Sequence, residues 1–203
     1  TDLVSLVHFF NQQRKELTEG QFLLSIDALR PQLTQWWQGF SLQEKRLFLS
    51  RFRHFWGIIR HRIPAEIAEM MREERASGKL EVRAGKIVST QLKGDQLRIQ
   101  FQSGEVTFHD QFTCFINCTG PETSVEQMSN PVIQELLERK WIEPDETSQG
   151  IQIQNENLRV IGPAPLSIYA IGNLCKGTLW ESTAVGELRS QAKLIAKGIL
   201  GDN

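Results

Sequence analysis

The beginning of the chain carries apolar side chains at helical spacing. They recur three and four residues apart, starting with Leu3, Leu6, Val7 and Phe10. Residues 41–44, Ser-Leu-Gln-Glu, form a capping box in front of a second apolar run. Pro64 stands where a further helix begins, and Gly78 ends that helix. The pattern therefore predicts that residues 1–77 form a helical segment.

After Gly78 the apolar residues alternate with polar ones. They do so in short stretches at residues 80–82, 87–88, 97–101 and 106–108. Gly94-Asp95 and Ser103-Gly104 are turn pairs between these stretches, so we expect an antiparallel meander. The meander leads into a longer apolar strand that we expect at residues 112–118.

The remaining pattern is a mixture of both periods. It predicts a helix over residues 131–140, strands at 151–153 and 167–173, and a last helix over about 183–200. The change of period divides the chain into a helical segment, residues 1–77, and a second part, residues 78–203. The expected fold class is therefore α+β.

Composition limits the classes of function. The 203 residues are 40% hydrophobic and 23% charged, and the net charge is −1. This balance favours neither nucleic acid nor an anionic membrane surface as a partner. Apolar runs are too short, and too often interrupted by Gly and Pro, to span a bilayer, and no signal-like leader opens the chain. With an odd number of cysteines as well, we expect a cytoplasmic protein.

Familiar catalytic and metal-binding motifs are missing from the sequence. Neither G-x-S-x-G nor H-E-x-x-H occurs, and no side chain stands out as an acid, base or nucleophile. The histidines have no metal-ligand spacing with one another or with the cysteines; they are His8, His54, His61 and His109. Cys114 and Cys118 share one face of the expected strand at 112–118, which predicts small core residues. We assign no catalytic residue and no metal site.

Two apolar stretches end at glycines, where the backbone can come close to another group such as a cofactor. Residues 112–121, FTCFINCTGP, finish in a small-Thr-Gly turn, and residues 167–173, SIYAIGN, break at Gly172. Glycine lets the chain turn there without a Cβ clash. By contrast, no G-x-G-x-x-G follows a predicted strand, so the usual phosphate-cradling turn of a Rossmann unit is absent from this sequence. An ordinary strand-to-loop turn is the alternative interpretation.

The last predicted helix follows Trp180, Glu181, Ser182 and Thr183. Ser182 or Thr183 can cap this helix, and its first free N–H groups offer a partial positive charge to a ligand. Every helix start has such donors, so simple capping explains the same residues.

A basic stretch lies at residues 45–62, with six cations and no acidic residue. Arg46, Arg53 and Arg60 are seven residues apart, which places them on one helical stripe opposite the Phe and Trp side chains. The stretch is either a solvated face covering an aromatic core or a phosphate site. For the second case, Arg60-His61-Arg62 before the Pro64 break is the best candidate for holding NADPH or an anionic substrate.

Taken together, these segments resemble a known family in their order and spacing. The chain is similar to FAD/NAD(P)-binding oxidoreductase-like proteins, flavoproteins with two dinucleotide-binding domains. The matching segments are residues 27–31, 36–37, 48–53, 56, 60–62, 78–80, 84–85, 117–121, 169–172, 177–185, 187–189 and 191–192.

The resemblance implies an FAD site. It implies an α/β-like arrangement in which the second part, residues 78–203, is a β-meander with the C-terminal portion of a Rossmann-like FAD-binding domain. Cys118, Thr119, Gly120 and Pro121 would then lie near the adenosine diphosphate of FAD. The family's Gly-Asp pair at the ribityl chain is here Gly172-Asn173, and Asn can still donate and accept.

The same resemblance assigns the last helix to the flavin itself. Its start, residues 180–183, would face the N1/O2 edge of the isoalloxazine and stabilise negative charge on it. The family's amino-terminal part, with the Gly-rich pyrophosphate turn, has no counterpart here. Because Thr1 lies inside an apolar-periodic run and is not a Met, we expect a C-terminal portion of a larger protein, inactive by itself.

The leading hypothesis is therefore part of an FAD-dependent oxidoreductase that works with NAD(P)H and a small-molecule substrate. Its first partner would be the N-terminal FAD-binding portion. The alternative hypothesis is a non-catalytic module that keeps a degenerate dinucleotide-binding fold and binds a protein through its helical part.

Overall fold

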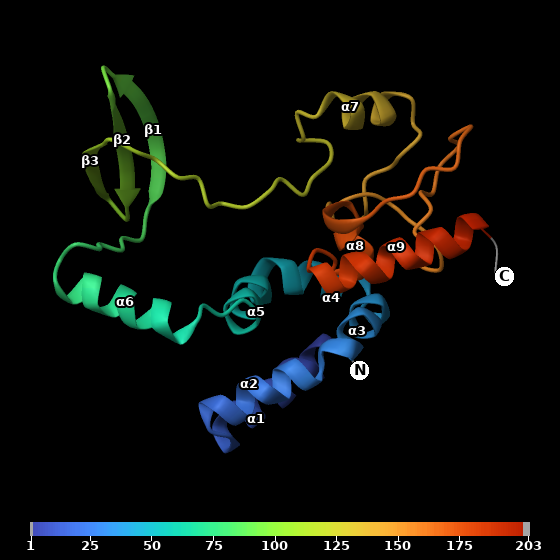
Figure 1. Cartoon of the computed structure of the whole chain (residues 1–203), viewed down its shortest axis with the longest axis horizontal. Helices are drawn as coiled ribbons and strands as arrows, with labels where there is room; N and C mark the ends of the chain where they lie inside the picture. The colour runs from blue at the N-terminus through green and yellow to red at the C-terminus, as the bar shows by residue number, and fades with distance from the viewer. Residues whose placement is uncertain (1, 201–203) are drawn as a thin grey trace. The chain divides into compact units, whose positions relative to one another are not determined.

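A computed structural model describes residues 2–200, which form helices and one three-stranded antiparallel sheet (Figure 1). The mixture confirms the expected α+β class at this level. Backbone contacts divide the chain into two compact units: unit 1 comprises residues 1–62 and 122–203, and unit 2 comprises residues 63–121. This division differs from the expected boundary after residue 77, because the helix α6 (Ala65–Ala76) falls in the unit that contains the sheet.

Unit 1 begins with a series of helices. They are α1 (Leu3–Glu16), α2 (Glu19–Ala28), the 3₁₀ turn η1 (Arg30–Gln32), α3 (Leu33–Gly39), α4 (Leu42–Leu47), the π-helical turn η2 (Phe48–Phe52) and α5 (Arg53–Arg60). Their starts follow the caps in the sequence, because Asp2 caps α1 and capping boxes begin α2 at Thr18 and α4 at Ser41. The capping box at residues 41–44 is thus confirmed.

The π-helical turn changes which residues share a helix face. In η2 the helix widens, and the N–H of Arg53 bonds the carbonyl of Phe48. This extra residue per turn shifts the register between Arg46 and Arg53. Arg46 is exposed, whereas the Arg60 side chain is only 7% exposed. The expected single stripe of Arg46, Arg53 and Arg60 is therefore wrong.

An aromatic core holds these helices together. Its buried members are Leu3, Trp37, Phe40 and Phe48, and half-buried Trp36, Phe52, Trp56 and Trp180 pack against them. Trp180 comes from the far end of the chain, so this core joins both stretches of unit 1. Burying aromatic side chains of this size is the main stabilising contribution here.

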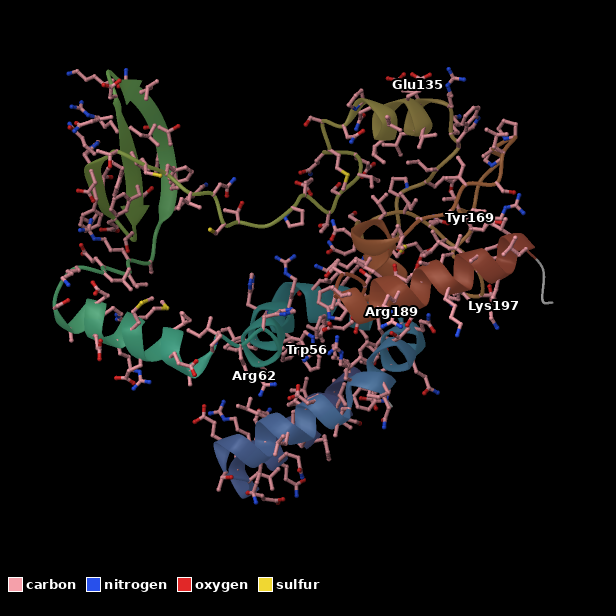
Figure 2. All side chains as sticks on the ribbon, viewed as in Figure 1. Trp56, Arg62, Glu135, Tyr169, Arg189 and Lys197 are labelled. Carbon is pink, nitrogen blue, oxygen red and sulfur yellow. The ribbon has the colours of Figure 1, made fainter. Side chains whose placement is uncertain are left out.

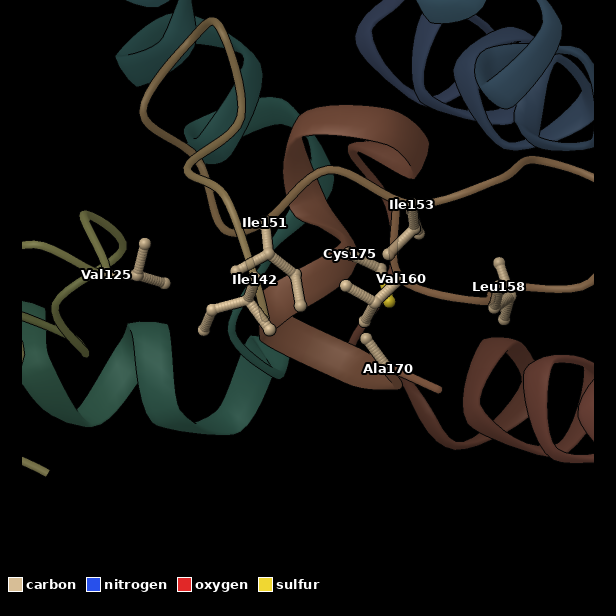
Figure 3. Close-up of a cluster of buried hydrophobic side chains, with 8 residues drawn as sticks. All are labelled: Val125, Ile142, Ile151, Ile153, Leu158, Val160, Ala170 and Cys175. Carbon is tan, nitrogen blue, oxygen red and sulfur yellow. The ribbon is translucent and has the colours of Figure 1, made fainter. Parts of the chain in front are cut away.

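The second stretch of unit 1 contains α7 (Pro131–Glu138), η3 (Gly172–Cys175), α8 (Lys176–Leu179) and α9 (Val185–Leu200). The helices predicted at 131–140 and 183–200 are confirmed, each about two residues shorter. The strands expected at 151–153 and 167–173 are wrong, because only isolated bridges form there, such as Ile153 with Val160 and Arg159 with Tyr169. Ile151, Ile153 and Cys175 nevertheless belong to a buried cluster (Figure 3).

Unit 2 contains α6 and the sheet. Pro64 precedes α6, and Gly78 follows it with φ +77°, as the sequence predicts. The strands β1 (Lys86–Lys93), β2 (Gln96–Ser103) and β3 (Val106–Phe112) lie in the order β1-β2-β3, all antiparallel. The expected meander is confirmed, except that residues 80–82 form no strand.

The longer apolar strand expected at residues 112–118 is also wrong. β3 ends at Phe112, and residues 113–121 have no regular structure and are exposed. Cys114 and Cys118 are exposed too, not core residues. An apolar strand needs neighbours that satisfy its backbone and cover its faces. No strand among residues 2–200 pairs with this segment.

No helix among residues 2–200 is long and apolar enough to cross a membrane.

Candidate functional site

A buried glutamine joins two of the segments that the sequence singled out. Gln191 lies on α9 and is 5% exposed. Its Oε1 accepts a hydrogen bond from the Gly172 N–H at 2.7 Å, and its Nε2 donates to the Ser182 carbonyl at 2.9 Å. Both bonds are buried, so they hold the Gly172 turn against the residues that precede α9. We call Gly172, Ser182 and Gln191 the glutamine bridge.

Gly172 has little room for any other residue. It is buried, its φ is +73°, and an added Cβ would lie 3.3 Å from Cδ2 of Leu188. Asn173 follows in η3, half-buried, and its Nδ2 donates to the Glu122 carbonyl at 3.5 Å. That distance is at the long limit for a hydrogen bond. The Asn173 amide is therefore only weakly engaged.

Trp180 is held in an unusual backbone conformation. Its φ is +56° and its ψ is −67°, a region that side-chain-bearing residues rarely adopt. Its ring packs on Trp37, with centroids 4.9 Å apart, and on Phe48 at 5.0 Å. The indole N–H of Trp37 donates to the Gly177 carbonyl at 2.7 Å. These contacts from α3 and η2 fix the strained turn between α8 and α9.

Glu181 connects the same turn to α5. It accepts a hydrogen bond from the Trp56 indole N–H at 2.9 Å, and its carboxylate lies 3.7 Å from Nε of Arg60. Trp56 is labelled on this helix in Figure 2. Arg60 Nε is buried and makes no hydrogen bond. The Glu181 carboxylate therefore lies within ion-pair distance of a buried guanidinium.

Arg60 and Arg62, the arginines proposed to bind an anion, both form ion pairs with the Asp27 carboxylate. Asp27 lies 3.5 Å from Nη1 of Arg60 and 2.6 Å from Nη2 of Arg62, whereas His61 is exposed at the end of α5. A phosphate would have to compete with Asp27 for these donors. Residues 27–31 and 60–62, two of the matching segments, thus touch each other. An anion site at Arg60, His61 and Arg62 stays a prediction.

A second ion pair joins η1 to the first turn of α9. Nη2 of Arg30 lies 2.5 Å from Oε1 of Glu187. Burial is the largest single influence and raises the pKa of Glu187, but the hydrogen bonds from Arg30 and the backbone, together with the charges of Arg30 and Arg60, lower the pKa overall. Glu187 Oε2 is buried without a partner. Glu187 therefore carries its charge at neutral pH next to the start of α9.

Lys176, beside the turn before α9, has a charged form that its surroundings destabilise. Lys176 on α8 lies with Nζ 5.0 Å from the centre of the Trp180 ring. Burial, and then the charge of Arg53, lower the pKa of Lys176, although Glu181 opposes the shift. The turn before α9 is therefore framed by aromatic rings and by charges of both signs.

The start of α9 differs from the prediction. The helix begins at Val185, and the N–H of Leu188 bonds the carbonyl of Ala184, so Ala184 holds the capping position. Capping by Ser182 or Thr183 is wrong. The Ser182 side chain is 2% exposed, and its Oγ has no hydrogen-bond partner within the chain. A buried, unpaired hydroxyl is costly, and this one belongs to the residue whose carbonyl accepts the Gln191 bond.

The CTGP turn belongs to unit 2. Cys118, Thr119, Gly120 and Pro121 are exposed. Oδ1 of Asn117 accepts bonds from the Thr119 N–H at 3.0 Å and from its hydroxyl at 2.8 Å, and Gly120 has φ +87°. The turn is thus formed locally, by an Asn side chain and a glycine. Gly172, Asn173 and residues 180–183 belong to unit 1.

Gln191 and Asp27 were missed as functional residues, although both lie in segments that carried the resemblance. Gln191 falls among apolar residues of α9, namely Leu188, Ala192 and Ile195. A polar side chain on an apolar face is a usable signal, because burying it requires a hydrogen-bond partner. Nothing in the sequence indicates that its partners are Gly172 and Ser182.

Comparison with known proteins adds no assignment. The chain matches no family model, no curated protein and no solved structure. Within residues 2–200, no group of three or more His, Cys, Asp or Glu side chains is arranged to hold a metal ion.

Proposed function

We propose that this chain forms part of the flavin site of an FAD/NAD(P)-dependent oxidoreductase-like protein, with the C-terminal portion of a Rossmann-like FAD-binding domain. The observation that carries the proposal is the glutamine bridge, which ties the Gly172 turn to the residues before α9. The resemblance in sequence assigns those same two segments to flavin. FAD would supply the redox chemistry, and the protein would supply position and electrostatics.

The residues of unit 1 suit such a group in two respects. A side chain at position 172 would lie 3.3 Å from Leu188, so glycine lets this turn lie close against α9. Ser182 Oγ is buried and unpaired, and three residues later α9 begins at Val185 with N–H groups that carry a partial positive charge. Gly172, Asn173 and residues 180–183 would hold the flavin end. Cys118, Thr119, Gly120 and Pro121 would hold the adenosine diphosphate end.

This sequence lacks the Gly-rich turn that binds pyrophosphate. Pyrophosphate contacts carry much of dinucleotide affinity, so the chain alone should bind FAD weakly or not at all. The proposal therefore includes an N-terminal FAD-binding portion as a partner. NAD(P)H and a small-molecule substrate are the further ligands that this function requires.

The test uses the longest reading frame that contains this chain. We expect its product to purify with a flavin absorption band, and Gly172→Val and Gly120→Val to lose that flavin. Gly104→Val is the matched control, because Gly104 also has a positive φ, +60°, but lies in the β2–β3 turn. A colourless product, or equal flavin content in all three folded variants, would show that the flavin assignment is wrong.

The anion site at Arg60, His61 and Arg62 is tested separately. If these residues bind NADPH or an anionic substrate, Arg60→Ala should weaken that ligand by about 1.5–3 kcal/mol, the range for a charge-assisted bond. If Arg60 only pairs with Asp27 and Glu181, the variant should lower the melting temperature and leave ligand affinity unchanged. Titration of NADPH, NADH and phosphate against both proteins distinguishes the cases.

One observation favours a non-catalytic module that binds a protein, although through residues 113–121 and not through the helical part. Residues 113–121 have no regular structure and no pairing strand, and Phe115 and Ile116 are 49% and 77% exposed. Exposed apolar segments of this kind suit a partner strand. The module would bind no flavin in any reading frame. A stable protein complex that is lost in Ile116→Asp, from a chain without flavin, would establish it.

A further inference from the structure

A cavity of about 320 Å³ lies within unit 1, among the helices of residues 2–62. Side chains from α1, α2, α3, η2 and α5 line it, together with Trp180. Its size is at the lower end of the range for small-molecule sites, about 300–1,000 Å³. Only two of its lining residues, Asn11 and Arg14, are polar or charged.

The walls of the cavity suit an apolar body. Four of the chain's five tryptophans line it: Trp36, Trp37, Trp56 and Trp180. The indole N–H groups of Trp37 and Trp56 are already bonded, to the Gly177 carbonyl and to Glu181. The rings therefore offer apolar surface and leave few polar atoms for water. A roomy apolar cavity holds water poorly and favours an apolar occupant.

The charged residue that lines the cavity, Arg14, is exposed to solvent at its rim. Arg14 and Asn11 are exposed and lie three residues apart on one face of α1. No carboxylate of residues 2–200 forms an ion pair with Arg14. A guanidinium without a partner, next to an amide, can bind a carboxylate through two donors. The cavity thus combines an apolar interior with a cationic rim.

We propose that this cavity binds a small amphipathic carboxylate. Its alkyl or aryl body lies among the tryptophan rings, and its carboxylate lies at Arg14 and Asn11. Aromatic walls and one cation at the rim are complementary to such a molecule in shape and charge. The proposal does not depend on a flavin site, because none of the binding groups is a cofactor; the two sites share Trp180.

Tryptophan fluorescence of the chain, titrated with decanoate, tests the proposal. Because four tryptophans line the cavity, binding should change the emission in a saturable way. Decanol is the neutral comparison, since it has a similar alkyl body without the carboxylate. An emission that changes only linearly with decanoate, without saturation, would overturn the proposal.

A larger side chain in the wall of the cavity should fill its space and weaken ligand binding. Val7 lines the cavity, whereas Val4, on the same helix, is 56% exposed and does not. We expect Val7→Phe to weaken decanoate about tenfold or more, and the matched Val4→Phe to leave it unchanged. Circular dichroism checks that both are folded. Equal affinity in both folded variants would overturn the assignment to this cavity.

The rim is tested by charge. Arg14→Gln should weaken decanoate by about two- to fivefold, the range for an exposed ion pair, and leave decanol unchanged. Lys15→Gln is the matched control, because Lys15 also lies on α1 but does not line the cavity. Both sites are exposed, so neither variant threatens the fold. If Arg14→Gln and Lys15→Gln weaken decanoate equally, Arg14 does not bind the carboxylate.

Discussion

Both units of this protein contain helices and apolar residues, but unit 1 buries many of its apolar side chains and unit 2 buries few. Among the described residues of unit 1, fifteen apolar residues are buried, and twelve of them form an aromatic cluster around Trp37 and an aliphatic cluster around Cys175. In unit 2, Ile99 is the single buried apolar residue among those that the structure describes. Secondary structure alone therefore says little about stability, which depends on the apolar surface removed from water.

The sheet of unit 2 is supported mainly by local contacts. Phe101 and Phe108 stack across β2 and β3 with centroids 5.2 Å apart, and the guanidinium of Arg83 lies within 6 Å of both rings. Every residue of β1 is exposed. Sheets of three strands need a covered face for independent stability. We therefore expect unit 2 to open more readily than unit 1.

The largest expected effect is in unit 1. Trp37 is 2% exposed and donates to Gly177, so Trp37→Ala should lower the free energy of unfolding by about 3–5 kcal/mol. Trp37→Phe keeps an aromatic ring but loses the hydrogen bond, and should cost less. Urea denaturation followed by circular dichroism measures both. A loss below about 1 kcal/mol for Trp37→Ala would mean that the aromatic cluster does not stabilise the unit.

A comparable truncation in unit 2 should act locally. Ile99→Ala should cost about 2–3 kcal/mol, the lower part of the range for core truncations, because no other buried apolar residue among those described in unit 2 packs around it. Hydrogen exchange should then accelerate in β1, β2 and β3 and stay unchanged in α1–α3. Val88→Ala, at a position 51% exposed in β1, is the control. Acceleration in both units would show that they unfold together, against the proposed difference.

The next effect is the pH dependence of the Arg30–Glu187 pair. The folded pKa of Glu187 lies below the ordinary 4.5, so the pair stabilises unit 1 above that pH, and the contribution is lost as the pH falls through the folded pKa. We expect Glu187→Gln to cost about 1 kcal/mol at pH 7, since Arg30 is 45% exposed, and much less at low pH.

The control for that experiment is Glu135→Gln. Glu135 pairs with Arg139 one turn along α7, and both side chains are 53% exposed. Its loss should change the stability little at any pH. Melting curves between about pH 3 and pH 7 compare the two variants, and identical pH profiles would contradict the role of Glu187.

The smallest expected effect on stability comes from chemical labelling of the cysteines, which differ in exposure between the two units. Cys114 and Cys118 are exposed in unit 2, whereas burial raises the pKa of the Cys175 thiol in unit 1 to about 12. A thiol reagent at pH 8 should label the first two within minutes without changing the melting temperature, and Cys175 only after unfolding. Mass spectrometry locates the labels. Early labelling of Cys175 would show that unit 1 opens as readily as unit 2.

The sequence alone determined most of the local structure. Caps and turn residues predicted the starts of α4 and α7, the end of α6 and the turns of the meander, because these features depend on neighbours within a few residues. The expected helical segment also follows, since apolar side chains at helical spacing need only a common face to bury.

The tertiary structure decided what the periodicity could not. The apolar runs at 112–118 and 167–173 have the pattern of strands, but a strand requires a partner. No strand pairs with the first run beyond Phe112, and the second run makes a single bridge. Likewise, the π-helical turn at Phe48–Phe52 breaks a repeat that is regular in sequence.

Some features of the candidate site could also be predicted from the sequence, and others only the fold shows. Its glycines were visible in the sequence, because a positive φ and a tight approach favour Gly at a single position. The glutamine bridge, the Asp27 contacts of Arg60 and Arg62, and the tryptophan-lined cavity were not. Gly172 and Gln191 are 19 positions apart, and Asp27 and Arg60 are 33 positions apart. Only the fold brings such residues together, and burial then requires their polar groups to find partners.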